Sequence, residues 1–291
     1  MMMMKTAIAI ATLLIAPFAI GAVYAEDGEG ASTPYFQTTT FNAPIIEDWE
    51  NQSTDDIAQF HLAAEQATIR TASLATGDVI AAVESELDAL TGSQVSPPIY
   101  SDKVNLADGT WHVLAYDLDE ATTASVMARR AGERTVVISF VERDPAARTV
   151  VLTLARTDDA QDDAGREIAL ALDAIGGSLP SLLKQADNVT LPSGDWVVYS
   201  SDGAAAMGMV FGNDSYVALR EGAPGDLAAL ADAWNRTLLG FFITPDNSRY
   251  LALGLAVVFA ILGTLMGSHY WRDRSLRKDL ALLEQLAGEE G

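Results

Sequence analysis

The chain has 291 residues, of which 49% are hydrophobic, and its formal net charge at pH 7 is −22. The apolar share is ample for a packed core, whereas the acidic surplus excludes a nucleic-acid-binding protein, because phosphates need a basic face. Cysteine is absent, which excludes disulfides, thiolate metal ligands and a cysteine nucleophile.

The first 25 residues predict a cleavable signal peptide. Lys5 supplies the basic start, and an apolar stretch follows from Thr6 to Ile20. Val23 and Ala25 place short side chains at the positions that a signal peptidase reads. The alternative is a retained N-terminal anchor, but Pro17 and Gly21 interrupt the apolar stretch and favour cleavage. An exported chain without disulfides suits a bacterial envelope.

Residues 26–55 form a segment rich in Ser, Thr, Pro and Gly with scattered aromatic residues, among them Tyr35, Phe41 and Trp49. Its composition predicts an extended arm. The arm either packs on the following domain or docks on a partner, and composition does not choose between these two.

An internal repeat follows, with a first copy at residues 56–145 and a second at 146–222. The segment Val104–Val113 matches Val189–Val198 at an offset of 85 residues, so that Trp111 falls on Trp196. A shared order of elements at a fixed offset is the signature of duplication. We expect Trp111 and Trp196 to lie in the core of the two copies rather than to take part in catalysis.

Each copy predicts one β-α-β-β-β unit, because runs of β-branched residues flank one segment with helical periodicity. This order favours an α+β fold with antiparallel sheet and helices on one face. Hairpin turns are expected at Gly132 and at Gly212-Asn213. In the first copy the strands are expected at 68–74, 111–117, 124–130 and 134–141 and the helix at 78–90; in the second, the strands at 149–155, 196–201, 206–211 and 216–220 and the helix at 162–175.

A further amphipathic helix is predicted at Asp226–Leu239, within a segment (223–249) that ends as a membrane-proximal linker. Residues 250–271 then predict a transmembrane helix. The 21 residues Tyr250–Tyr270 contain no Asp, Glu, Lys or Arg, and as a helix they span ~31 Å, enough to cross the hydrocarbon core.

Interface residues flank this helix and indicate its orientation. Tyr250, Tyr270 and Trp271 are the aromatic residues expected at the two membrane surfaces. The tail, residues 272–291, opens with four basic residues, which predicts a cytoplasmic C-terminus. The helical spacing of the tail's leucines predicts a separate short helix that lies on the membrane or docks on another subunit. The four basic residues are Arg272, Arg274, Arg277 and Lys278.

Small residues recur every three or four positions along the transmembrane helix and make one narrow face. Such faces let membrane helices approach closely. We expect this face to pack on a membrane protein partner or on a second copy of the chain. The residues of the face are Ala252, Ala256, Ala260, Gly263 and Gly267.

No catalytic, cofactor or metal motif emerges from the sequence. Ser181 and Lys184 match a Ser-x-x-Lys pattern, but the Lys-Thr-Gly motif that accompanies it in acyl-transfer enzymes is missing. His61 and His112 are isolated. Residues 26–248 hold 12 basic and 35 acidic residues, a net charge of −23, which either steers a basic soluble periplasmic protein to the domain or adapts its surface to salt.

These features together predict a non-catalytic, single-pass accessory subunit of an envelope membrane complex. It would lie in a bacterial inner membrane, with its N-terminal domain in the periplasm and its C-terminus in the cytoplasm. The alternative is a membrane-tethered periplasmic hydrolase or ligand-binding domain with a cleft between the two copies.

Overall fold

The elements described below belong to one unit of the chain, Tyr35–Gly291. The predicted signal peptide and Ser181 lie outside the described residues. The computed structural model describes residues 34–92, 95–106, 108–155, 164–175, 184–185, 188–201, 203–222, 225–244 and 248–289.

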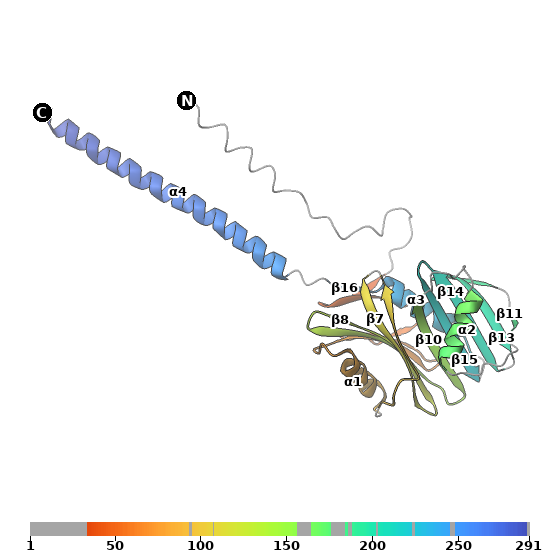
Figure 1. Cartoon of the computed structure of the whole chain (residues 1–291). Coiled ribbons are helices and arrows are strands. Elements are labelled where there is room, and N and C mark those ends of the chain that lie inside the picture. Colours follow the sequence, from red (N-terminus) through yellow and green to blue (C-terminus); the bar gives the residue numbers. More distant parts are fainter. Residues whose placement is uncertain are drawn as a thin grey trace. The chain divides into compact units, whose positions relative to one another are not determined.

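The first sheet is antiparallel and has seven strands in the order β3-β4-β5-β9-β8-β7-β6 (Figure 1). Four of these strands were expected from the sequence. The strands β3, β4 and β6 were not; β3 has only two residues, and most residues of β6 are polar. The bounds are β3 Glu50–Asn51, β4 Ile57–Leu62, β5 Ala67–Leu74, β6 Tyr100–Leu106, β7 Gly109–Asp119, β8 Thr122–Ala131 and β9 Arg134–Arg143.

The second sheet is also antiparallel, with the order β10-β15-β14-β13-β11 and with β12 paired to β13. Its hairpin between β14 and β15 turns on Gly212, and the hairpin between β8 and β9 turns on Gly132. Both glycines have positive φ, +61° and +68°, as two-residue hairpin loops require. The bounds are β10 Ala147–Ala155, β11 Lys184–Gln185, β12 Val189–Leu191, β13 Gly194–Ser201, β14 Ala204–Phe211 and β15 Asp214–Gly222.

The two sheets share their topology. The path β5-β9-β8-β7-β6 corresponds to β10-β15-β14-β13-β12, with one helix after the first strand in each case. The register agrees as well, because Val104 pairs with Trp111 and Val189 pairs with Trp196. Each of the two repeated units therefore contains one strand more than the predicted β-α-β-β-β order.

Each sheet carries a helix on one face. Helix α1 (Val79–Thr91) begins at Asp78, whose carboxylate accepts hydrogen bonds from the backbone N–H groups of Ile80 and Ala81, at 3.0 and 3.2 Å. It ends at Gly92, which has a left-handed conformation. Helix α2 (Ala164–Ala174) packs on the second sheet, mainly on β14. The α+β class with antiparallel sheets is confirmed.

The described part of the N-terminal arm, residues 34–55, packs on the domain. Its strands β1 (Tyr35–Gln37) and β2 (Phe41–Pro44) form a three-stranded antiparallel sheet with β16 (Phe242–Ile243). Phe41 and Trp49 of the arm are buried. Of the two alternatives for this segment, the structure therefore selects packing on the domain.

One hydrophobic cluster joins the two large sheets, the three-stranded sheet and helix α3 (Leu227–Gly240). Trp234 of α3 meets Phe140 of β9 edge to face, with ring centroids 6.4 Å apart. Trp111 meets Phe241 in the same manner at 5.6 Å. A second cluster fills the space between α1 and the opposite face of the first sheet. The first sheet is thus covered on both faces.

Helix α4 (Ser248–Glu289) is one continuous helix of 42 residues. Its stretch Ala252–Leu280 is long and apolar enough to cross a membrane, and its side chains are exposed there. The prediction of a separate tail helix is wrong, because α4 runs unbroken through residue 271. The reason is that residues 271–286 contain neither Gly nor Pro and are mostly good helix formers.

Candidate functional site

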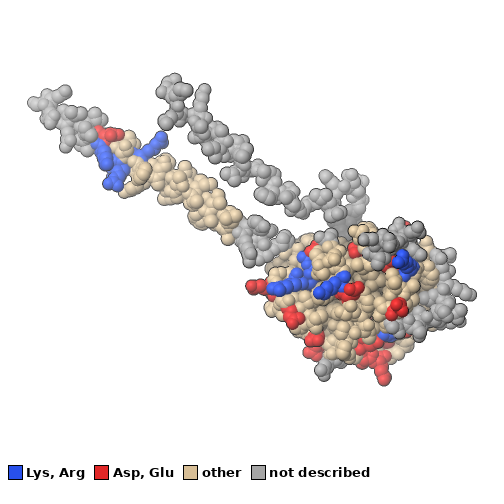
Figure 2. All heavy atoms as spheres, in the orientation of Figure 1, with Lys and Arg blue, Asp and Glu red and all other residues tan. Residues whose placement is uncertain are grey.

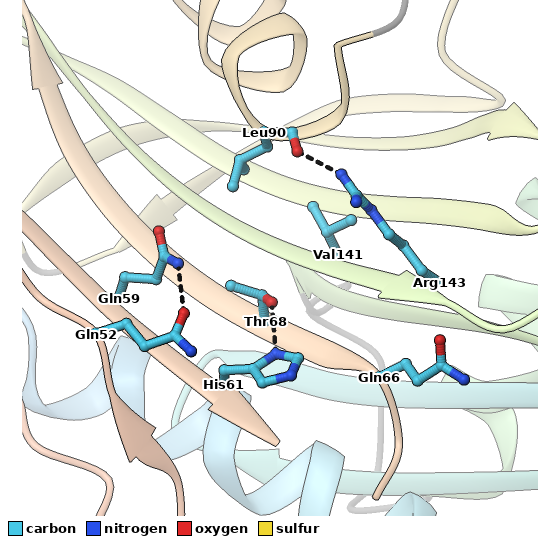
Figure 3. A pocket seen from close by; sticks show the side chains of 8 residues that line it. All are labelled: Gln52, Gln59, His61, Gln66, Thr68, Leu90, Val141 and Arg143. Carbon is cyan, nitrogen blue, oxygen red and sulfur yellow. Dashed lines mark hydrogen bonds between the residues drawn. The ribbon is translucent and has the colours of Figure 1, made fainter. Parts of the chain in front are cut away.

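A polar pocket of about 340 Å³ lies on the first sheet beside the C-terminal end of α1. It opens where the helix no longer covers strands β4, β5 and β9 (Figure 3). Amide, imidazole and guanidinium groups supply most of its wall. The lining residues are Gln52, Gln59, His61, Gln66, Thr68, Leu90, Val141 and Arg143.

Hydrogen bonds hold the polar side chains of this pocket in place. Arg143 donates to the backbone carbonyl of Leu90, where a cation is favourable because helix α1 ends there. The Nδ1 atom of His61 lies 3.1 Å from the Thr68 hydroxyl, which leaves Nε2 for a ligand. Gln59 donates to the side chain of Gln52 at 3.0 Å. The pocket is therefore preorganised for polar contacts.

Gln66 has φ of +50° and is the one non-glycine residue with positive φ in the described part of the chain. It ends the hairpin loop between β4 and β5, and its carbonyl accepts from the Arg143 backbone N–H at 3.1 Å. A left-handed conformation costs an L-residue about 1–2 kcal/mol, which glycine avoids. Strained backbone conformations of this kind occur preferentially at functional sites.

A buried ion pair lies beside the pocket, beneath α1. The Nε atom of Arg70 on β5 lies 2.7 Å from Oε1 of Glu86 on α1, and Arg70 also donates to Gln59 at 3.4 Å. Burial raises the pKa of Glu86, and the Arg70 cation opposes this shift. The pair ties the helix to the sheet at the edge of the pocket.

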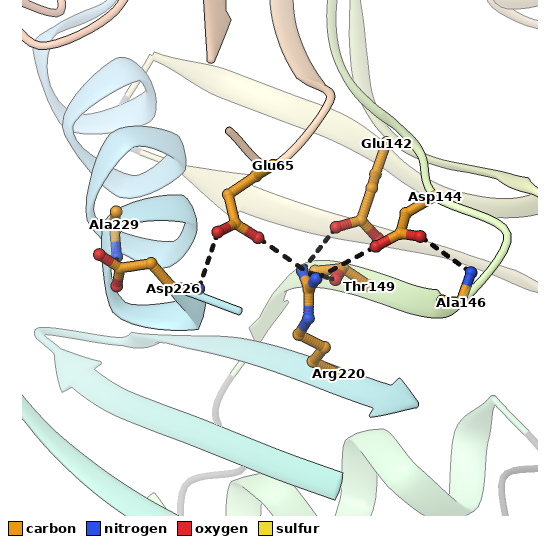
Figure 4. Close-up of polar contacts among 8 residues, drawn as sticks. All are labelled: Glu65, Glu142, Asp144, Ala146, Thr149, Arg220, Asp226 and Ala229. Carbon is orange, nitrogen blue, oxygen red and sulfur yellow. Dashed lines mark hydrogen bonds and ion pairs between the residues drawn. The ribbon is translucent and has the colours of Figure 1, made fainter. Parts of the chain in front are cut away.

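A second polar cluster surrounds Arg220 of β15 (Figure 4). Its Nη1 atom lies 2.6 Å from Oε1 of Glu142 and 3.1 Å from the Thr149 hydroxyl. Its Nη2 atom lies 3.2 Å from Oε2 of Glu65 and 3.6 Å from Oδ2 of Asp144. Arg220 and Glu142 are both buried, and burial raises the pKa of Glu142.

The Arg220 cluster joins parts of the chain that are far apart in sequence. Glu142 is the next-to-last residue of β9, and Glu65 belongs to the β4–β5 loop. Glu65 accepts from the Asp226 backbone N–H at 3.1 Å, just before α3. A Cβ atom at Gly225 would collide with Oε2 of Glu65 and Nη2 of Arg220, so a side chain there would displace these two groups. We interpret this cluster as a structural clamp between the two sheets and α3.

No family model, curated protein or solved structure matches the chain. The role of the candidate site is therefore inferred from its geometry alone. Among the described residues, no three His, Asp or Glu side chains gather so as to hold a metal ion.

The structure places the residues singled out in the sequence in separate regions. Trp111 and Trp196 are buried, and their indole N–H groups donate to Asp108 and Ser193, at 2.8 and 3.1 Å. The small face and the basic flank both lie on α4. The polar pocket was not expected from the sequence, because its residues are scattered between positions 52 and 143 without a motif.

Proposed function

We propose that the protein is a single-pass accessory subunit of an envelope membrane complex, with its folded domain in the periplasm and its C-terminus in the cytoplasm. Helix α4 carries this proposal, because 29 consecutive residues are apolar enough to cross a membrane and bury nothing against the domain. A helix of this kind needs lipid or another helix around it. The basic residues that follow residue 271 support a cytoplasmic C-terminus.

The small-residue face of α4 supports assembly with another membrane helix. A Cβ atom at Gly263 or Gly267 would meet nothing within 4 Å, so both positions are open to a partner. Val258, Ile261 and Leu265 lie on the opposite side of the helix at 100° per residue. Close backbone approach along a glycine face is a common way for such helices to associate.

Replacing Gly263 and Gly267 together by isoleucine should release the protein from its membrane partner. The added side chains prevent close approach, and each 1.4 kcal/mol lost weakens association about tenfold. The measurement is co-purification from membranes in mild detergent. The matched control is Val258→Ile with Leu265→Ile, on the opposite side of α4, which should leave co-purification intact. Equal recovery of the partner with both double variants would contradict assembly through this face.

A second candidate function is the binding of a small polar ligand in the pocket beside α1. The left-handed Gln66 favours it, because a strained glutamine at a position suited to glycine indicates a use for its side chain. The preorganised Arg143 and His61 groups support the same conclusion. This pocket lies within the first sheet rather than between the two repeats.

Gln66→Gly tests this second candidate. If the glutamine serves ligand binding, its replacement should keep or raise the free energy of unfolding, by up to about 1 kcal/mol, because glycine removes the left-handed strain. The measurement is urea denaturation of the full chain in detergent, followed by tryptophan fluorescence. A loss of more than about 1 kcal/mol would show that Gln66 stabilises the fold, and it would remove the argument for a ligand.

We also infer that the two sheets arose by duplication. The matching strand order, the shared register around Trp111 and Trp196, and the offset of 85 residues in the sequence support this.

A further inference from the structure

We propose that the three-stranded sheet is a lipid-contacting surface, through which the domain rests on the membrane that α4 crosses. This proposal rests on the proposed membrane anchor. The lipid-contacting surface, here called the apolar end patch, consists of Tyr35, Leu239 and Phe242. Their side chains are 39%, 43% and 47% exposed.

The apolar end patch is built by three neighbouring elements. Tyr35 of β1 and Phe242 of β16 meet edge to face, with ring centroids 5.6 Å apart. Leu239 lies in the last turn of α3, and the next residue, Gly240, lies against Pro44, the partner of Tyr35 in the sheet. Exposed aromatic pairs are costly in water, whereas aromatic rings favour the interface between lipid and water.

The chain around this patch carries no charge. Neither Tyr35–Ile46 nor Thr237–Thr244 contains Asp, Glu, Lys or Arg, although 20% of the whole chain is charged. Acidic and basic side chains both appear on the face of the domain in Figure 2. A patch built from uncharged segments can approach lipid without the cost of desolvating its own charged groups.

The length of the connection to α4 brings this end close to the membrane. Thr244 is fixed to the three-stranded sheet, since its N–H donates to Thr40 at 2.9 Å and its hydroxyl accepts from Asn42 at 3.1 Å. Helix α4 begins four residues later, at Ser248. Four residues reach at most about 14 Å. The three-stranded sheet therefore lies near the headgroups whenever α4 crosses the bilayer.

A single-cysteine label tests this contact, because the chain has no cysteine of its own. Gln37 is exposed, and both Gln37 and Phe242 pair with Asn42, so Gln37→Cys places a probe beside the patch without altering it. Ala146→Cys is the control, since Ala146 is exposed and lies next to Asp144 of the Arg220 cluster, near the start of α3, whereas the patch lies at the end of α3. The full chain is reconstituted in phosphatidylcholine vesicles that contain acyl-chain spin-labelled lipid, and quenching of the fluorophore is measured.

We expect several-fold stronger quenching of the label at position 37 than at position 146. Adding Tyr35→Ser and Phe242→Ser should remove the difference. Equal quenching at the two positions would overturn the lipid-contacting surface. A label at Leu255→Cys in α4 separates the two proposals: if it is quenched while position 37 is not, the membrane anchor stands alone, and if neither is quenched, the anchor and the contact both fail.

Discussion

Arg220→Met should lower the free energy of unfolding by about 3–5 kcal/mol, because it leaves the buried Glu142 without its cation. Glu142 would then either remain charged in a nonpolar environment or take up a proton, and both cost free energy. The measurement is urea denaturation of the full chain in mild detergent, followed by tryptophan fluorescence.

Arg148→Met is the matched control for this variant. Arg148 also links strands of the two sheets, and it lies 2.5 Å from Asp117 of β7 and 3.8 Å from Glu221 of β15. Its side chain is 32% exposed, so water screens these pairs and the expected cost is below about 1 kcal/mol. If the two variants cost the same, burial is not what makes the Arg220 cluster a clamp.

Trp111→Ala and Trp196→Ala should each cost about 3–5 kcal/mol, because both indoles are buried in the cluster that spans the two sheets. Since that cluster is continuous, each variant should unfold in one transition at a lower urea concentration. Trp271→Ala is the control: Trp271 is 78% exposed on α4, and its loss should leave the unfolding transition of the domain within about 0.5 kcal/mol.

Two separate unfolding transitions would contradict a shared core. If Trp196→Ala unfolds the second sheet and leaves the first sheet folded, the two units are independent domains in spite of their contacts. Near-ultraviolet circular dichroism distinguishes the cases, because Trp111 and Trp234 report on the environment around Phe241 and Phe140.

Periodic apolar patterns account for the part of the fold that the sequence predicts. Helix α1, for example, was expected at 78–90 and runs from Val79 to Thr91, because capping and the apolar stripe act locally. Strand β6 escaped prediction because four of its seven residues, Ser101, Asp102, Lys103 and Asn105, are polar and its order depends on pairing with β7. Edge strands of this kind owe their structure to tertiary contacts.

The candidate sites were harder to predict, because they depend on long-range contacts. Arg220 meets Glu65 and Glu142, which lie on two other elements far along the chain. In the sequence, nothing distinguishes these three residues from ordinary charged residues on the surface. Gln66 gave no local signal either, because only the backbone conformation distinguishes it from other glutamines in loops.

The location of the domain and of the C-terminus is the central claim, and fusions to alkaline phosphatase test it most directly, because this enzyme becomes active only after export. A fusion after Asn247 should be active and one after Gly291 inactive, if the domain is periplasmic and α4 crosses the inner membrane. The opposite pattern, or equal activity of the two fusions at equal expression, would contradict a periplasmic domain with a cytoplasmic C-terminus.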